Sequence, residues 1–163
     1  MKSHHYKATI EWTGNLGKGT LTYNEYERSH SIEVEGKNSI EASSDPSFRG
    51  DSAKYNPEEL FLSSLSSCHM LWFLHLCSVE GVIVTEYIDH AKGIMMEEKD
   101  GRGKFTEVVL NPIVTVTKER MISKLDSIHQ KANQMCFIAN SCNFPVKHYA
   151  KSTVRENSYK AER

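Results

Sequence analysis

Apolar and polar side chains alternate from Tyr6 to Trp12, which is typical of a strand with one buried face. The glycine-rich segment 14–19 predicts a turn, and we expect residues 20–23 to return as the antiparallel partner. Residues 32–34 mark a third strand. The polar stretch 43–55 then reads as a loop that precedes the strongest helix signal of the chain.

That helix signal begins at Asn56, an N-cap residue followed by Pro57 at the first helical position. Glu59 at the third position completes a capping box. The pattern continues to about Glu80, and Gly81 suits the position just after the helix end. Because the helix is apolar nearly all round, we expect it to be buried on most sides, by sheets or by a second copy of itself.

Strand patterns return after this helix. Segments 87–96 and 105–116 flank a hairpin turn at 100–103, and apolar residues follow helical spacing over 121–135. A last strand is predicted over 146–154. Strands, a long helix, strands, a helix and a strand make an α+β fold.

The chain has 163 residues and a net charge of −1. This length predicts a single domain, 1–163, with a flexible tail at 155–163. Charges of both signs are mixed along the chain, so we expect no nucleic-acid partner and no membrane partner. No secretory signal is visible and the longest apolar stretch is short, which predicts a cytoplasmic protein.

Four cysteines are present, and in a reducing compartment such residues are buried, metal-binding or catalytic. Cys77 follows Cys68 by nine helical residues, which places it roughly 13 Å away on the opposite face. Cys77 is therefore expected to be a buried apolar residue. Cys136 or Cys142, on a separate element, can approach Cys68.

Two segments carry a family resemblance. The Asn-Pro-Glu-Glu-Leu segment at 56–60, followed by small residues and the Ser-Ser-Cys of 66–68, resembles the first signature of the OsmC/Ohr family (osmotically inducible protein C and organic hydroperoxide reductase). Segment 136–141 resembles the second signature and also follows a helix. Cys68 and Cys136 lie 68 positions apart, which suits the family, and the likeness is closer to the OsmC-like branch.

The resemblance implies antiparallel sheets wrapped around a long buried central helix, in an intertwined homodimer. It also implies a thiol-dependent peroxidase that reduces organic hydroperoxides to alcohols without a metal or other cofactor. Cys68 attacks the peroxide and becomes a sulfenic acid, and Cys136 then forms a disulfide with it. A dithiol, or a lipoyl group on another protein, restores the thiols.

The thiolate of Cys68 needs a nearby cation, because an ordinary cysteine has a pKa of about 8.5. Cys68 sits more than two turns inside the helix, where the helix dipole contributes little. The resemblance implies an arginine held by Glu58. Arg49, just upstream of the motif, matches the OsmC-branch position, and Arg28 is a second candidate.

Glu58 precedes Cys68 by ten residues, or about 15 Å of helix. An arginine bound to Glu58 would have difficulty touching Cys68 of the same helix. We therefore predict that each site combines Cys68 of one chain with Glu58 and Arg49 of another, in a symmetric homodimer.

Several residues share the helix face of Cys68 and are expected to form the substrate pocket. They are Ser64, Leu65, Leu71 and Trp72, with His75 on the same face. His69 is expected to be packed or hydrogen-bonded.

Three alternatives stay open. Cys142 is an extra thiol that can act as the resolving cysteine instead of Cys136. Cys68, His69, His75, Cys136 and Cys142 have the chemistry of zinc ligands, although their spacing matches no standard zinc motif. Finally, the chain can be a non-enzymatic dimeric binding protein that uses the interface pocket for a small apolar ligand.

Overall fold

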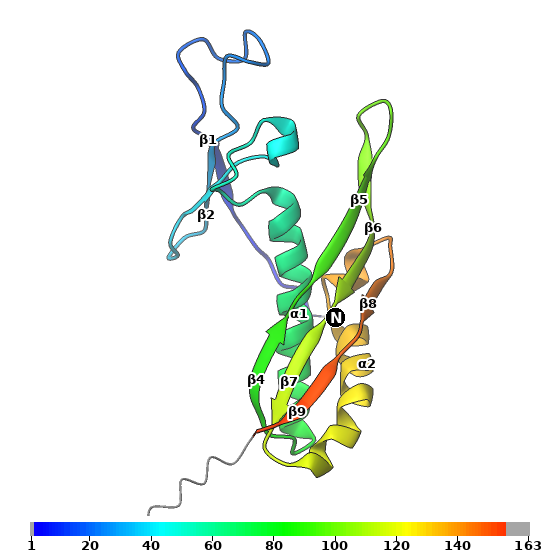
Figure 1. Cartoon of the computed structure of the whole chain (residues 1–163). Coiled ribbons are helices and arrows are strands. Elements are labelled where there is room, and N and C mark those ends of the chain that lie inside the picture. The colour runs from blue at the N-terminus through cyan, green and yellow to red at the C-terminus, as the bar shows by residue number, and fades with distance from the viewer. Residues whose placement is uncertain (1, 156–163) are drawn as a thin grey trace, which may run out of the picture. The chain divides into compact units, whose positions relative to one another are not determined.

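The computed structural model describes residues 2–155 (Figure 1), so the tail predicted at 155–163 lies outside the described residues except for Arg155. Contacts divide the chain into two compact units, one ending at Phe61 and the other starting at Leu62. Helix α1 (Pro57–Val79) begins in the first unit and continues into the second.

The first unit holds a three-stranded antiparallel sheet in the order β1-β2-β3. Its strands are β1 (Thr9–Trp12), β2 (His30–Glu33) and β3 (Ile40–Ala42). The short 3₁₀ helix η1 (Pro46–Phe48) follows. The expected strands near residues 6–12 and 32–34 are thus confirmed as strands, with bounds shifted by one to three residues.

The return strand expected at 20–23 is wrong, because these residues form bends and turns. The Asn15 side chain accepts hydrogen bonds from the backbone N–H groups of Gly17 and Gly19, both at 2.9 Å. Such a side-chain cap closes the backbone into a local turn. The chain rejoins the sheet later, where Glu27 donates its N–H to the Gly14 carbonyl at 2.9 Å.

Helix α1 starts and stops as its sequence predicts. Glu59 donates its backbone N–H to the Asn56 side chain at 2.8 Å, and Asn56 donates its own N–H to the Glu59 carboxylate at 3.2 Å. At the other end Gly81 has a φ of 69°, in the left-handed region that favours glycine. The N–H of Val82 then bonds to the Cys77 carbonyl at 2.8 Å, which closes the helix.

The second unit contains two three-stranded sheets, ordered β4-β7-β9 and β5-β6-β8. Its strands are β4 (Val84–Asp89), β5 (Lys92–Glu97), β6 (Gly103–Leu110), β7 (Pro112–Val116), β8 (Val146–His148) and β9 (Lys151–Val154). Each of the three long strands expected here is divided in two. One division falls at Asn111, whose side chain donates to the His90 carbonyl at 3.0 Å, just before Pro112 removes a backbone donor.

The sheets of the second unit are mixed, so the expectation of wholly antiparallel sheets is wrong for two strands. Strands β4 and β5 pair antiparallel with β7 and β6, but β8 and β9 pair parallel with β6 and β7. The cause is the crossover between them, which contains 3₁₀ helix η2 (Glu119–Lys124), helix α2 (Leu125–Met135) and 3₁₀ helix η3 (Ala139–Ser141). A connection of this length returns the chain in its original direction.

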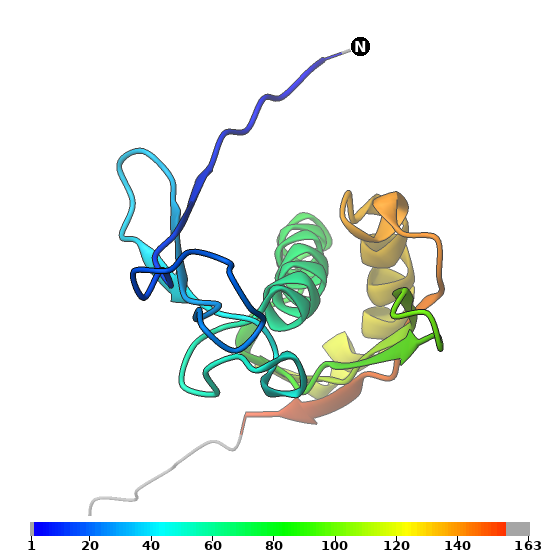
Figure 2. The ribbon, with the colours of Figure 1, turned by 90° about the horizontal axis from the view of Figure 1, so that it is seen from above.

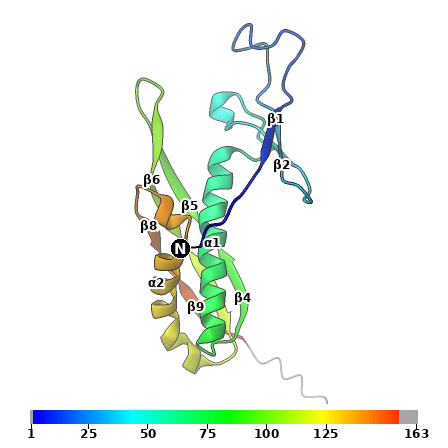
Figure 3. The same cartoon turned by 180° about the vertical axis from the view of Figure 1, so that it is seen from behind.

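Helices α1 and α2 lie side by side on one face of the strands (Figures 2 and 3). The buried face of α1 consists of Leu65, His69, Phe73, Leu76 and Cys77. The last three pack in one core with residues of β7 and α2, including Val114, Leu125 and Ile128.

Much of α1 lies outside this core. Leu71 is 63% exposed and Val79 is 68% exposed. The length and hydropathy of α1 would also suit a membrane span, but core helices of globular proteins share both properties. The strands of the second unit thus cover one face of α1, and the expected burial of the opposite face by a second copy stays a prediction.

Candidate functional site

Two cysteines far apart in the sequence meet between α1 and α2. Cys68 lies in the fourth turn of α1 and is half-buried, whereas Cys136 caps the C-terminus of α2 and is 1% exposed. A hydrogen bond joins their side chains, and both are free thiols. Of the two partners left open for Cys68, the structure therefore brings Cys136 into contact.

The environment of this pair is asymmetric. Burial and the hydrogen bond with Cys68 together raise the pKa of Cys136 to about 11. Cys136 therefore keeps its proton at neutral pH and acts as the donor. Cys68 is the more accessible thiol of the two, because it is half-buried whereas Cys136 is 1% exposed.

The other two cysteines have separate roles. Cys77 is 1% exposed in the core, and burial raises its pKa to about 12, which confirms the expected apolar cysteine. Cys142 follows η3 and donates its thiol proton to the Ile138 carbonyl at 3.2 Å. Burial also raises the pKa of Cys142. Neither thiol has an environment that favours ionisation.

The residues expected to form one pocket with Cys68 do not share one environment. Leu65 is fully buried, Leu71 is exposed, and Ser64 and Trp72 are half-buried. Trp72 makes edge contacts with His75 and with Phe137, both with ring centroids 5.8 Å apart. Phe137 directly follows Cys136, so the aromatic pair of Trp72 and Phe137 lies beside the two thiols. Sequence patterns predicted Trp72 as a pocket residue but did not predict Phe137.

The candidate arginines and Glu58 belong to the first unit. Arg28 is engaged there, because its guanidinium lies 4.1 and 4.3 Å from the ring centres of Tyr23 and Tyr26. It also donates to the carbonyls of these two tyrosines at 2.8 and 2.6 Å. Arg28 is thus held by its own unit.

Arg49 presents the opposite picture. Its side chain is exposed and its backbone has a φ of 64°, which is costly for a residue other than glycine. The surrounding loop enforces this conformation, since Asp45 caps η1 by accepting the Ser47 N–H at 2.7 Å. Ser44 and Tyr23 donate side-chain hydrogen bonds to the Phe48 carbonyl. The loop therefore holds Arg49 in a strained, exposed position.

Glu58 is partly buried in the first turn of α1. Its Oε2 atom is buried and has no hydrogen-bond partner among the described residues. A buried carboxylate oxygen without a partner carries a large desolvation cost, so this atom is a candidate acceptor for a side-chain donor.

Two buried histidines and the half-buried His148 form a cluster that sequence analysis did not connect. His69 of α1 and His129 of α2 are each 1% exposed, and their Nε2 and Nδ1 atoms are 3.0 Å apart. His148 of β8 lies 5.5 and 5.8 Å from them, between ring centroids. The prediction that His69 is packed and hydrogen-bonded is thus confirmed. The partners were not predictable, because no local spacing joins positions 69, 129 and 148.

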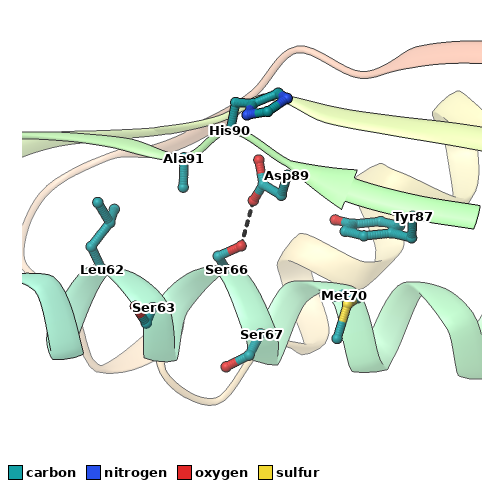
Figure 4. Close-up of a pocket in the computed structure, with 9 residues that line it drawn as sticks. All are labelled: Leu62, Ser63, Ser66, Ser67, Met70, Tyr87, Asp89, His90 and Ala91. Atoms are coloured by element: carbon teal, nitrogen blue, oxygen red, sulfur yellow. Dashed lines mark hydrogen bonds between the residues drawn. The ribbon is translucent and has the colours of Figure 1, made fainter.

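A cavity of about 510 Å³ lies along another face of α1 (Figure 4). Ser66 donates to the Asp89 carboxylate at 2.5 Å, and Asn111 donates its backbone N–H to the same carboxylate at 2.6 Å. The lining consists of Leu62, Ser63, Ser66, Ser67, Met70, Tyr87, Asp89, His90 and Ala91. Neither thiol of the contacting pair lines this cavity, so it is separate from the cysteine site.

The zinc alternative requires several ligand side chains close together. Within residues 2–155, no group of three or more His, Cys, Asp or Glu side chains is placed to hold a metal ion.

Comparison with known proteins places this geometry in a family. Residues 50–150 match the family model described as OsmC-like protein, and the chain belongs to that family. A solved OsmC-like protein of unknown function from Vibrio cholerae shares 33% identity over 91% of this chain and 99% of its own, with a TM-score of 0.81. No curated protein matches.

More distant structures share the fold. An organic hydroperoxide resistance protein from Elizabethkingia anophelis is 16% identical, covers 94% of this chain and 99% of its own, and has a TM-score of 0.67. An organic hydroperoxide resistance protein from Legionella pneumophila is 15% identical, covers 94% of this chain and all of its own, and has a TM-score of 0.68.

The histidine cluster predicts acid sensitivity. Burial, and then the charge of neighbouring histidines, lowers the pKa of His69 to about 4 and that of His129 to about 3. The unfolded chain binds these protons near pH 6.5, so the free energy of unfolding should fall as the pH drops below that value. The expected loss at pH 5 is on the order of 2 kcal/mol for each histidine.

Urea unfolding at pH 7 and pH 5 measures this loss. The matched control is the double variant His69→Gln, His129→Asn, which removes both titrating rings and keeps amides in place of the bonded nitrogens. Its pH dependence should be flatter than that of the wild type. Equal pH dependence in the two proteins would contradict the assignment.

Proposed function

We propose that this protein is a thiol peroxidase that reduces organic hydroperoxides to alcohols. The thiolate of Cys68 attacks the outer peroxide oxygen, so that an S–O bond forms and the O–O bond breaks. The alkoxide leaves and takes a proton to become the alcohol. Cys136 then attacks the sulfenic sulfur, and a disulfide and one water molecule result.

The contact between Cys68 and Cys136 is the observation that carries this proposal. Disulfide formation requires two cysteines whose Cα atoms lie within about 7 Å of each other. Cysteines far apart in the sequence meet this condition only through the fold. Family membership adds to it, since relatives from Elizabethkingia anophelis and Bacillus subtilis bear the name organic hydroperoxide resistance protein.

The cation for Cys68 is proposed to be Arg49 of a second copy, bound by Glu58 of that copy. Arg28 is engaged by two tyrosines, whereas Arg49 is exposed on a strained loop. Glu58 has a buried oxygen that has no hydrogen-bond donor among the described residues, and a guanidinium would supply one. Arg49 and Glu58 thus complement each other chemically.

The second copy is proposed to pack on the uncovered face of α1 in a homodimer. Ser67, Leu71 and His75 are exposed at four-residue spacing, which forms one stripe along the helix. Leu71 at 63% exposure is the most apolar part of this stripe. A symmetric dimer would bury the stripe against its own copy and create two equivalent sites.

The substrate is proposed to be an organic rather than an inorganic hydroperoxide. Trp72 and Phe137 place aromatic surface beside the thiols, and Phe137 is 67% exposed. Such surface binds the hydrocarbon part of an organic peroxide, which hydrogen peroxide lacks. A dithiol, or a lipoyl group on another protein, is the proposed reductant.

Turnover of cumene hydroperoxide with dithiothreitol tests the function. Cys68→Ser should abolish turnover, because it removes the attacking sulfur, while Cys77→Ser, the matched control on the same helix, should retain it. Cys136→Ser should still consume one equivalent of peroxide, leaving a sulfenic acid that dimedone traps. A wild-type protein with no turnover and unchanged thiols would instead favour the dimeric binding protein that needs no catalysis.

Mixing two inactive variants tests whether two chains share each site. Cys68→Ser and Arg49→Gln should each be inactive, and mixed dimers regain one complete site of two. Co-refolded at equal amounts, the two variants should recover about one quarter of wild-type activity, since half of the dimers are mixed.

Mixing Cys68→Ser with Cys136→Ser provides the control for this experiment. Both of these cysteines act within one chain, so this mixture should recover nothing. Absence of recovery in the Arg49→Gln mixture would show that the arginine acts within its own chain or not at all.

A further inference from the structure

Two polar contacts, made by neighbouring residues, join α1 to α2. Cys68 meets Cys136, and His69, the next residue on α1, bonds to His129 of α2 at 3.0 Å. His129 precedes Cys136 by seven residues, about two helical turns, so both face α1 from nearly the same side of α2. The histidine contact therefore lies in the same helix interface as the thiols.

The histidine pair is held on several sides. The two imidazole rings are nearly parallel, with an interplanar angle of 3° and centroids 5.3 Å apart. The ring of Phe73 stacks on His129 with centroids 3.9 Å apart, and His148 from β8 contacts both histidines. This packing holds the ring planes, and the hydrogen bond adds a directional link between the two helices.

In the described part of the chain, the other nitrogen of each ring makes no hydrogen bond that could hold the helices in place of this one. His69 Nδ1 and His129 Nε2 are buried and have no partner among the described residues. Within residues 2–155, the bond between the two rings is thus the only side-chain hydrogen bond that either ring makes. An apolar pair of similar size would fill the same space without the directional bond.

We propose that His69 and His129 are positioning residues that hold the Cys136 thiol at Cys68 for disulfide formation. A rotation of α2 by about 30° moves an atom roughly 5 Å from its axis by about 2.5 Å, which is enough to separate two sulfurs. Of the two thiols, only Cys68 takes part in the attack on peroxide, so the histidine pair serves the second step. This role rests on the proposed function for its biological meaning.

Equilibration with glutathione tests the proposal without any peroxide. The ratio of disulfide to dithiol in a glutathione buffer gives the effective concentration of Cys136 at Cys68. Cys142→Ser serves as the background, so that one exchange partner is removed. Turnover of cumene hydroperoxide is measured separately on the same proteins, which keeps failure of the proposed function distinguishable from failure of the positioning role.

The informative variant is the double change His69→Leu, His129→Leu, which removes both polar partners and leaves no orphaned ring. It should lower the effective concentration about tenfold, the order expected from the loss of one buried hydrogen bond. His69→Gln and His129→Asn place amide groups where the bonded nitrogens lie, and this pair should stay within about threefold of the background protein. Ser78→Ala, at an exposed position near the end of the same helix, is the matched control and should change nothing.

Thermal unfolding and size-exclusion chromatography show whether each variant is folded. An unchanged effective concentration in a folded double-leucine variant would overturn the proposal, because helix packing alone would then position the thiols. A tenfold loss that the glutamine and asparagine pair also shows would overturn it as well. Failure of the background protein to form a Cys68–Cys136 disulfide would also overturn the positioning role.

Discussion

The hydrogen bond between the Cys68 and Cys136 thiols is the interaction on which this account depends. It joins the middle of a long apolar helix to the end of a second helix, across an interface that also holds buried imidazole rings. Burial keeps the proton on Cys136 and thereby makes it a donor to Cys68. The more accessible sulfur, Cys68, is the one proposed to attack the peroxide, and Cys136 is the one proposed to complete the disulfide.

In the proposed mechanism this pair needs a cation, and both predicted arginines, Arg28 and Arg49, belong to the first unit. In that unit, Arg49 is strained and exposed, and a buried oxygen of Glu58 has no hydrogen-bond partner among the described residues. On α1, the stripe that contains Leu71 leaves apolar surface exposed. A second copy, as proposed, would cover this stripe and would bring Arg49, bound by Glu58 of its own chain, to Cys68 of the other chain.

Sequence analysis succeeded where the determinants are local. The capping box at Asn56 and the left-handed Gly81 set the bounds of α1 within a few neighbouring residues. It failed where distant partners decide, as in the parallel pairing of β8 and β9, which depends on the whole crossover through α2. Contact of Cys68 with Cys136 was implied by family resemblance, whereas the histidine cluster had no family motif and no spacing to reveal it.

Mass spectrometry of the protein after one equivalent of cumene hydroperoxide tests the central claim most directly. Trypsin leaves Cys68 and Cys77 on one peptide and Cys136 and Cys142 on another, so the linked peptides must be fragmented to locate the bond. The account predicts a single disulfide between Cys68 and Cys136. Four intact thiols, or a bond that joins Cys68 to Cys142 instead, would contradict it.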